Sequence, residues 1–225
     1  MGISLLVRHG QASFGADDYD VLSETGVEQS RVLGRALAAQ GLTPTRVVHG
    51  RMRRQRDTAT ALVEGAGWAV VPRVDEGWNE FDHVAVVARG LDDAQGPDGA
   101  RDLGDRRTFQ RLFEAATARW SGGENDAEYD ESWPAFFDRV NGALDRVFSE
   151  DGLTVVVSSG GPIAAVCATL VDPMCGADAV PRLWNAFNTV TANASVTRVL
   201  EGSTGRRLLS FNEHAHLPRE LVTYR

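Results

Sequence analysis

The sequence contains no lysine, so arginine supplies all 23 of its basic side chains. This absence excludes two kinds of chemistry. No lysine is present to form a Schiff base with a carbonyl substrate, and none to complete a P-loop around a nucleotide. Any anion must therefore be met locally, by groups placed at its own site.

Long apolar runs and a positive net charge are missing too. The 225 residues are 43% hydrophobic and carry a formal net charge of -8. No run approaches the roughly 20 apolar residues that a membrane-spanning helix needs. Binding to nucleic acid or to an anionic membrane requires a basic face, which an acidic chain lacks. We expect one globular domain whose partners include neither.

Cysteine is scarce, with Cys167 and Cys175 the two in the sequence. Their spacing forms no metal-ligand or redox pair, and no export signal precedes the first expected strand. Leu6 also spoils a myristoylation signal after Gly2. We therefore expect two buried thiols in a cytoplasmic protein.

Apolar runs typical of strands alternate with helical patterns along the chain. We expect strands at residues 3–7, 46–49, 69–74, 154–158, 194–200 and 207–211. One helix should run from a cap at Ser23 to Gly41, and another from about Arg53 to Ala66. This alternation predicts an α/β fold, a three-layer α/β/α sandwich with a mostly parallel central sheet and a helical insertion.

The insertion is expected at residues about 84–150 of a single domain, 1–225. Glycines and aspartates over 84–105 predict a mobile loop that closes on substrate. Two amphipathic helices should follow it, with core positions that include Trp120 and Trp133.

His9 is the first candidate for chemistry, because Arg8-His9-Gly10 directly follows the strand at 3–7. Open α/β sheets bind ligands at the carboxyl ends of their strands. A neutral imidazole there can attack phosphorus, a guanidinium can hold phosphoryl oxygens, and glycine lets the backbone come close. The tripeptide predicts a phosphate site; a plain hydrogen-bonded turn is the alternative.

Two more segments follow later strands. An arginine-rich stretch at 49–59 leads into a helix whose N-terminus favours anions, although most of its arginines can equally be solvated. In the acidic segment 76–83, Glu80 stands beside Trp78 and Phe81. Desolvation by these rings would raise the pKa of the carboxyl and let it protonate a leaving oxygen, whereas a solvated acidic loop is the alternative.

Taken in their order along the chain, these motifs resemble those of the histidine phosphatase superfamily, also called the phosphoglycerate mutase-like family, over nearly the whole chain. Residues 6–11, Leu-Val-Arg-His-Gly-Gln, match its signature. Residues 54–59, Arg-Gln-Arg-Asp-Thr-Ala, resemble its second-arginine box and single out Arg54. Asn79-Glu80-Phe81 falls where the family keeps its acid, and 193–197 and 211–217 resemble its closing segments.

The resemblance implies that His9 is phosphorylated transiently, while Arg8 and Arg54 clamp the phosphoryl oxygens. Glu80 would protonate the departing alcohol or activate water. The residues expected to bind phosphate are Arg8, Gly10, Gln11, Arg54, Ser159 and Gly160. Since arginines surround the group, neither a metal nor another cofactor is required.

Residues 154–162 match the family's last catalytic box except at one position, where Ser159 replaces a histidine. A serine hydroxyl is shorter, neutral and roughly half as strong a donor. Losing one such stabiliser costs about 10²–10³ in rate. Either Ser159 contacts phosphate itself while Arg51 or a nearby histidine supplies the charge, or turnover has decayed. Gly160 and Gly161 preserve a backbone donor site at a helix start.

Two other interpretations carry less weight. A serine hydrolase needs Gly-x-Ser-x-Gly, and Val157 occupies the first glycine position. His214 and His216 lack an obvious third ligand, so we assign no metal.

The sequence thus predicts a metal-independent phosphomonoester phosphatase that acts on a small phosphorylated substrate, slowly if Ser159 limits it. One rival is a phosphate-binding or regulatory protein without useful turnover. Another is a phosphoglycerate mutase-type phosphotransferase, although residues 81–83 show no likeness to the segment that mutases carry after the acid. The substrate and the oligomeric state, a dimer included, are left open.

Overall fold

The computed structural model describes residues 2–13, 20–94, 106–171 and 179–224. The strands in these ranges are β1 (Gly2–Arg8), β2 (Arg46–His49), β3 (Arg73–Val74), β4 (Leu153–Ser158), β5 (Val196–Gly202) and β6 (Gly205–Glu213). The α-helices are α1 (Glu24–Ala39), α2 (Arg53–Ala66), α3 (His83–Ala94), α4 (Arg106–Ser121), α5 (Trp133–Phe148), α6 (Gly160–Val171) and α7 (Ala179–Val190). Short 3₁₀ helices are η1 (Glu76–Trp78), η2 (Asp126–Glu128) and η3 (Arg219–Leu221).

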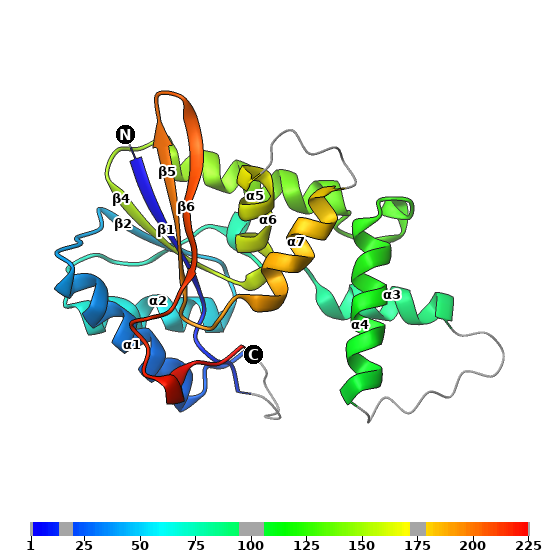
Figure 1. The fold of residues 1–225 in the computed structure, drawn as a ribbon, viewed down its shortest axis with the longest axis horizontal. Coiled ribbons are helices and arrows are strands. Elements are labelled where there is room, and N and C mark those ends of the chain that lie inside the picture. Colours follow the sequence, from blue (N-terminus) through cyan, green and yellow to red (C-terminus); the bar gives the residue numbers. More distant parts are fainter. Residues whose placement is uncertain (1, 14–19, 95–105, 172–178, 225) are drawn as a thin grey trace.

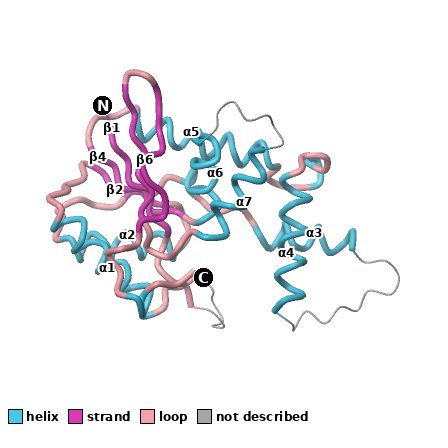
Figure 2. Tube along the Cα trace, in the orientation of Figure 1, coloured by secondary structure: helices cyan, strands magenta, loops and turns pink. Residues whose placement is uncertain are grey.

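The strands form one sheet in the order β3-β2-β4-β1-β5-β6 (Figures 1 and 2). β1, β2, β3 and β4 pair in parallel, whereas β5 and β6 continue the sheet antiparallel. The register places Arg8 beside Ser158 and His49 beside Val157. The parallel strands β1, β4 and β2 therefore end at the same edge of the sheet.

Alternation along the strands builds two separate cores. Leu5 and Val7 of β1 pack with Leu33 of α1 and Leu62 of α2, whereas Leu6 belongs to a cluster with residues of α5 and α6. Successive strand residues point to opposite faces, so each face of the sheet needs its own cover. Figure 1 shows α1 and α2 on one side and α5, α6 and α7 on the other. The predicted three-layer α/β/α sandwich is confirmed.

Both early helices begin where the sequence predicts. The Ser23 side chain accepts a hydrogen bond from the Gly26 backbone N at 3.1 Å, which satisfies a free donor at the start of α1. α2 runs from Arg53 to Ala66, as expected, and ends at Gly67, whose φ is +68°. This left-handed conformation suits glycine and stops the helix.

Two strands differ from their predicted bounds, one by its length and one by its position. Of residues 69–74, only Arg73 and Val74 form a strand, and Val71 is 78% exposed. β3 lies at the edge of the sheet, where little packing enforces an extended chain. β5 begins at Val196 rather than 194, because Ala194 has a φ of 53°, which a strand does not allow.

The prediction of a loop from residue 84 is wrong for its first part, which is the helix α3. Asp82 caps this helix through Oδ1, which accepts from the backbone N of Val84 and of Ala85, both at 3.0 Å. Val86 is buried in the core beside α4 and α5. A cap and an apolar face thus outweigh the local glycine and aspartate content. Residues 95–105 lie outside the described residues, so a closing loop stays a prediction.

The helices of segment 84–150 differ in how closely they pack against the sheet. α5 packs in the same core cluster as Leu6 and Val156, whereas α3 and α4 extend away from the sheet (Figure 1). Describing 84–150 as an insertion in a single domain stays a prediction. In the described ranges, no helix has the length and apolar content to cross a bilayer. Cys167 is a buried thiol, and Cys175 lies outside those ranges.

Candidate active site

The candidate residues gather where β1, β4 and β2 end. His9 follows β1, Ser159 follows β4, and His49 closes β2. The helices α2 and α6 begin beside these ends with Arg53 and Gly160. Backbone N–H groups at a helix N-terminus have no partner within the helix, so this edge of the sheet favours a bound anion or carboxylate.

His9 is held as a neutral imidazole. Its backbone N donates to the Ser158 carbonyl at 2.8 Å, and its Nδ1 lies 2.7 Å from the Gly10 carbonyl. A carbonyl can only accept, so Nδ1 carries the proton and Nε2 keeps its lone pair, to which Arg54 Nε donates at 3.2 Å. Burial first, then the charges of Arg54 and Arg8, hold the pKa of His9 well below 6.5. This is the protonation state that a nucleophile needs.

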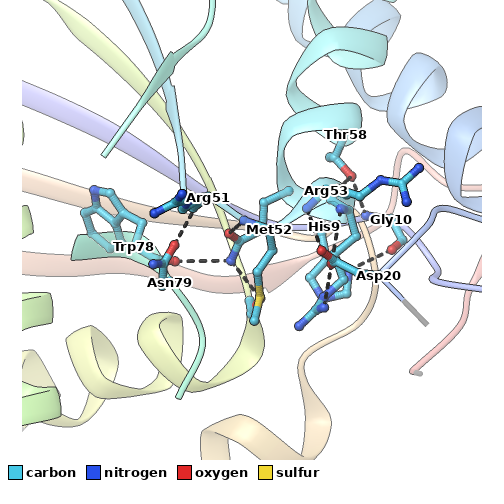
Figure 3. Close-up of polar contacts among 12 residues, drawn as sticks. His9, Gly10, Asp20, Arg51, Met52, Arg53, Thr58, Trp78 and Asn79 are labelled. Atoms are coloured by element: carbon cyan, nitrogen blue, oxygen red, sulfur yellow. Dashed lines mark hydrogen bonds and ion pairs between the residues drawn. The ribbon is translucent and has the colours of Figure 1, made fainter. Parts of the chain in front are cut away.

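Arg54 faces the imidazole from the first turn of α2. Its buried guanidinium pairs with the Asp20 carboxylate at 2.8 Å, and Asp20 also accepts from the backbone N of Arg53 at 2.8 Å (Figure 3). A carboxylate therefore already occupies the anion position formed by Arg54 and the helix N-terminus. A phosphoryl group bound to Arg54 has to share this position with Asp20 or displace it.

Thr58 joins α2 to the loop after β1. Its Oγ1 donates to the Arg54 carbonyl at 2.7 Å and accepts from the Gly10 backbone N at 2.9 Å. A Cβ at Gly10 would lie 2.3 Å from the Gly26 carbonyl oxygen of α1. Gly10 is therefore required for close packing against α1, and its contact to phosphate stays a prediction.

Arg8 lies near both ionisable candidates. Its guanidinium NH1 donates to the Thr191 carbonyl, after α7. Its positive charge lowers the pKa of His9 and also lowers that of Glu80. The two arginines that the sequence singles out are thus brought to one imidazole, from β1 and from α2.

Glu80 reaches the same place from the segment after η1. Its Oε1 accepts from the Phe81 backbone N at 3.1 Å, and its Oε2 accepts from the Gly161 backbone N at 3.2 Å. Burial raises the pKa of this carboxyl above 4.5, by more than those hydrogen bonds and the charges of Arg54 and Arg8 lower it. This upward shift of the pKa is the one that the flanking aromatic residues predict, and it suits Glu80 to act as a proton donor.

Ser159 is buried at the start of α6, only 1% exposed. Its Oγ accepts a hydrogen bond from Gln55 Nε2 at 2.9 Å, and Gln55 also donates to the Trp78 carbonyl at 3.1 Å. Gly160 follows it as the first residue of α6 and is buried.

Two other predicted contacts point elsewhere. The Oε1 of Gln11 accepts from Ser23 Oγ at 3.0 Å, which ties the loop to α1. Arg51 is exposed and pairs with Glu76 at 3.2 Å, so its charge is directed away from His9. Figure 3 shows Arg51 beside Asn79, and the Oδ1 of Asn79 accepts a hydrogen bond from the backbone N of Arg51. Phosphate binding by Gln11 stays a prediction.

Sequence reasoning missed three residues of this cluster. Asp20 was one of several aspartates in a polar segment, and nothing local marks it as the partner of Arg54. Gln55 stands between Arg54 and Arg56, and nothing local marks it as the partner of Ser159. His83 begins α3 three residues after Glu80 and is half-buried. Burial first, and then the positive charge of Arg54, lower its pKa below 6.5.

The two C-terminal histidines contact backbone carbonyls. His214 Nδ1 lies 2.6 Å from the Asn212 oxygen, and His216 Nε2 lies 3.1 Å from that of Ala194. Across the part of the chain that the structure describes, no three side chains of His, Cys, Asp or Glu gather as a metal site would require.

A hollow of about 520 Å³ opens beside Glu80, between α3, α4 and the segment around η2. Its apolar lining includes Phe81, Val86, Trp120 and Tyr129, and charged groups on its wall include Asp130, Arg89 and Arg139. A second hollow of about 640 Å³ lies at the opposite end of β2, beside Arg46 and Trp68. The first of these adjoins the candidate acid.

Comparisons with solved structures show the same fold. A phosphoserine phosphatase from Entamoeba histolytica, in complex with phosphoserine, is 18% identical with a TM-score of 0.65, covering 97% of this chain and 100% of that one. A phosphoglycerate mutase from Bacillus anthracis is 17% identical with a TM-score of 0.65, covering 95% and 94%. A mycobacterial glucosyl-3-phosphoglycerate phosphatase, solved with inorganic phosphate, is 22% identical with a TM-score of 0.63, covering 96% and 99%.

Sequence comparison gives one match and one negative result. No curated protein matches the chain. The family model described as histidine phosphatase superfamily (branch 1) matches residues 4–214, nearly the whole chain. This span contains the Arg8-His9-Gly10 box, Arg54, Glu80 and Ser159. The protein therefore belongs to the histidine phosphatase superfamily.

Proposed function

We propose that this protein is a phosphomonoester phosphatase that works through a phosphohistidine at His9. The observation that carries the proposal is the state of that imidazole. Its Nδ1 proton is fixed on the Gly10 carbonyl, and its Nε2 lone pair lies at Arg54 with Arg8 close by. A neutral nitrogen nucleophile beside two guanidinium groups suits attack on phosphorus.

In the first step, His9 Nε2 attacks phosphorus as Arg54 Nε turns from the ring to a phosphoryl oxygen. The P–N bond forms, the ester P–O bond breaks, and the proton of the Glu80 carboxyl passes to the leaving alkoxide. In the second step, the Glu80 carboxylate accepts a proton from water while the water oxygen attacks phosphorus. The P–N bond breaks, inorganic phosphate leaves, and His9 is again neutral.

The positive charge that Ser159 lacks needs another source. Arg51 is exposed and paired with Glu76, which leaves the alternative of a nearby histidine. We assign this role to His83, which begins α3 three residues after Glu80. Burial first, and then the charge of Arg54, lower its pKa, so the imidazole lies within electrostatic reach of that arginine. A dianionic phosphoryl group on Arg54 would favour its protonated form.

We place the alcohol part of the ester in the hollow beside Glu80, because this residue of the site lines it. Its volume of about 520 Å³ suits a small phosphorylated substrate rather than a macromolecule. The apolar lining and the position of Glu80 support hydrolysis with release of a neutral alcohol. A cytoplasmic location and the absence of a required metal stay predictions from the sequence.

A panel of phosphomonoesters tests the proposal through phosphate release without added metal. His9→Ala should abolish release, and acid-quenched protein should carry an acid-labile phosphoryl group only when His9 is present. If no ester is hydrolysed while phosphate still raises the melting temperature, the protein is a phosphate-binding or regulatory member of the family. Transfer of phosphate to a second alcohol in preference to water would instead indicate a mutase.

A further inference from the structure

Gln55 is the side chain that determines what the Ser159 hydroxyl can do. It is fully buried, and its amide nitrogen donates to Ser159 Oγ at 2.9 Å and to the Trp78 carbonyl at 3.1 Å. Its Oε1 accepts from the Met52 backbone N at 3.3 Å. Turning the amide over would set Oε1 against the Trp78 carbonyl, so the orientation is determined.

The hydroxyl of Ser159 is therefore an acceptor toward Gln55. An amide nitrogen has no lone pair available, so the serine proton must point elsewhere. Among the hydrogen bonds of the described residues, none uses this proton. A buried donor left without an acceptor is unfavourable, which favours a ligand that accepts its proton.

The ligand side of Ser159 is the His9 side. Arg8 of β1 is in register with Ser158 of β4, and the His9 backbone N donates to the Ser158 carbonyl at 2.8 Å. His9 and Ser159 are the next residues on these neighbouring parallel strands. A phosphoryl group on the imidazole would consequently lie beside Ser159, where it can accept the serine proton.

Gln55 also occupies space that a larger residue at position 159 would need. A Cβ at Gly50 would lie 2.1 Å from Gln55 Oε1, so the amide is wedged between Gly50 and Ser159. A histidine that kept the direction of the serine Oγ would collide with an amide nitrogen only 2.9 Å away. The glutamine and the serine therefore form one unit.

We propose that Gln55 is a positioning residue which makes the Ser159 hydroxyl a hydrogen-bond donor to the phosphoryl group. The pair then provides a contact where the family's second histidine would stand. This inference rests on the proposed phosphate site at His9, but not on turnover, since the donor also acts on a bound inorganic anion.

Gln55→Glu gives the sharpest test, because it keeps the length of the side chain and reverses the hydrogen bond to Ser159, at the cost of placing an oxygen against the Trp78 carbonyl. The carboxylate accepts the serine proton and removes it from the ligand. Binding of inorganic phosphate, and of vanadate as a probe of the phosphoryl-transfer geometry, should weaken about tenfold to hundredfold, as it should in Ser159→Ala. The double variant should bind no more weakly than Gln55→Glu alone. Ser4→Ala, which removes a buried hydroxyl distant from His9, is the control and should bind normally.

A second pair of variants keeps the test open if Gln55→Glu fails to fold. Ser159→His alone should be slower than the wild type, and adding Gln55→Ala should recover activity by making room for the ring. Folded Gln55→Glu that binds phosphate as tightly as the wild type, or a faster Ser159→His single variant, would overturn the proposal. Normal phosphate and vanadate binding with no hydrolysis of any ester would count against the phosphatase function only.

Discussion

Gly161 controls the position of the candidate acid, and adding one methyl group there should displace it. A Cβ at Gly161 would lie 2.1 Å from Glu80 Oε1 and 3.1 Å from the ring of Phe81. Non-bonded heavy atoms need about 3.5 Å, so the carboxyl must move by more than about 1 Å. The same movement breaks its hydrogen bond to the Gly161 backbone N.

The expected loss in Gly161→Ala depends on the leaving group. General acid catalysis contributes about 10²–10⁴ in rate, and a displacement of about 1 Å can cost about 10². Release of phosphate from an alkyl ester should therefore slow by about 10² or more. 4-Nitrophenyl phosphate should lose less than about tenfold, because its leaving group needs little protonation.

A matched glycine separates this effect from a general effect on the fold. In Gly142→Ala, on α5, the new methyl group would lie 3.8 Å from its nearest neighbour, Arg146. It should keep full activity and gain up to about 1 kcal/mol in the free energy of unfolding from helix propensity. Adding Gly161→Ala to Glu80→Gln should cause little further loss. Wild-type rates on alkyl esters in Gly161→Ala, or fully additive losses, would refute this account of Glu80.

The remaining predictions concern pH, the Asp20 carboxylate and His83. His9 must be neutral and Glu80 protonated, so kcat/KM should fall on the acid side only well below pH 6.5, and Glu80→Gln should remove the alkaline limb. Because the unfolded chain protonates His9 near pH 6.5 and the folded chain only at lower pH, urea titrations should show stability falling as pH drops below 6.5. His9→Gln should weaken that dependence, and the part that remains comes from histidines such as His83, whose pKa burial also lowers. Asp20→Asn removes a negative charge from the anion position at Arg54, so inorganic phosphate should inhibit about fivefold more tightly, and unchanged inhibition would contradict the proposed competition. His83→Gln should lower kcat by about tenfold or more with the fold intact, and wild-type kcat would remove His83 from the mechanism.

The local pattern of the chain was enough to predict the layers and most of the elements. Apolar runs that alternate with helical patterns predict the strands β1, β2 and β4. Helical patterns, together with caps such as Ser23, predict α1 and α2. The segment at 84–94 was misjudged, because its helix depends on the Asp82 cap and on burial of Val86 against other helices. Packing partners distant in the sequence decided that outcome.

The sequence by itself determined the candidate residues: His9, Arg8 and Glu80 could be named from residue type and from position after a strand, and Arg54 from the resemblance to the family's second-arginine box. Their protonation states could not be named, since these depend on burial and on charges brought from other elements. Only the folded chain places Asp20 on Arg54 and Gln55 on Ser159, contacts between segments 34 and 104 residues apart. Short-range patterns specify a strand end or a helix cap, whereas the direction of a proton depends on neighbours that the tertiary structure alone supplies.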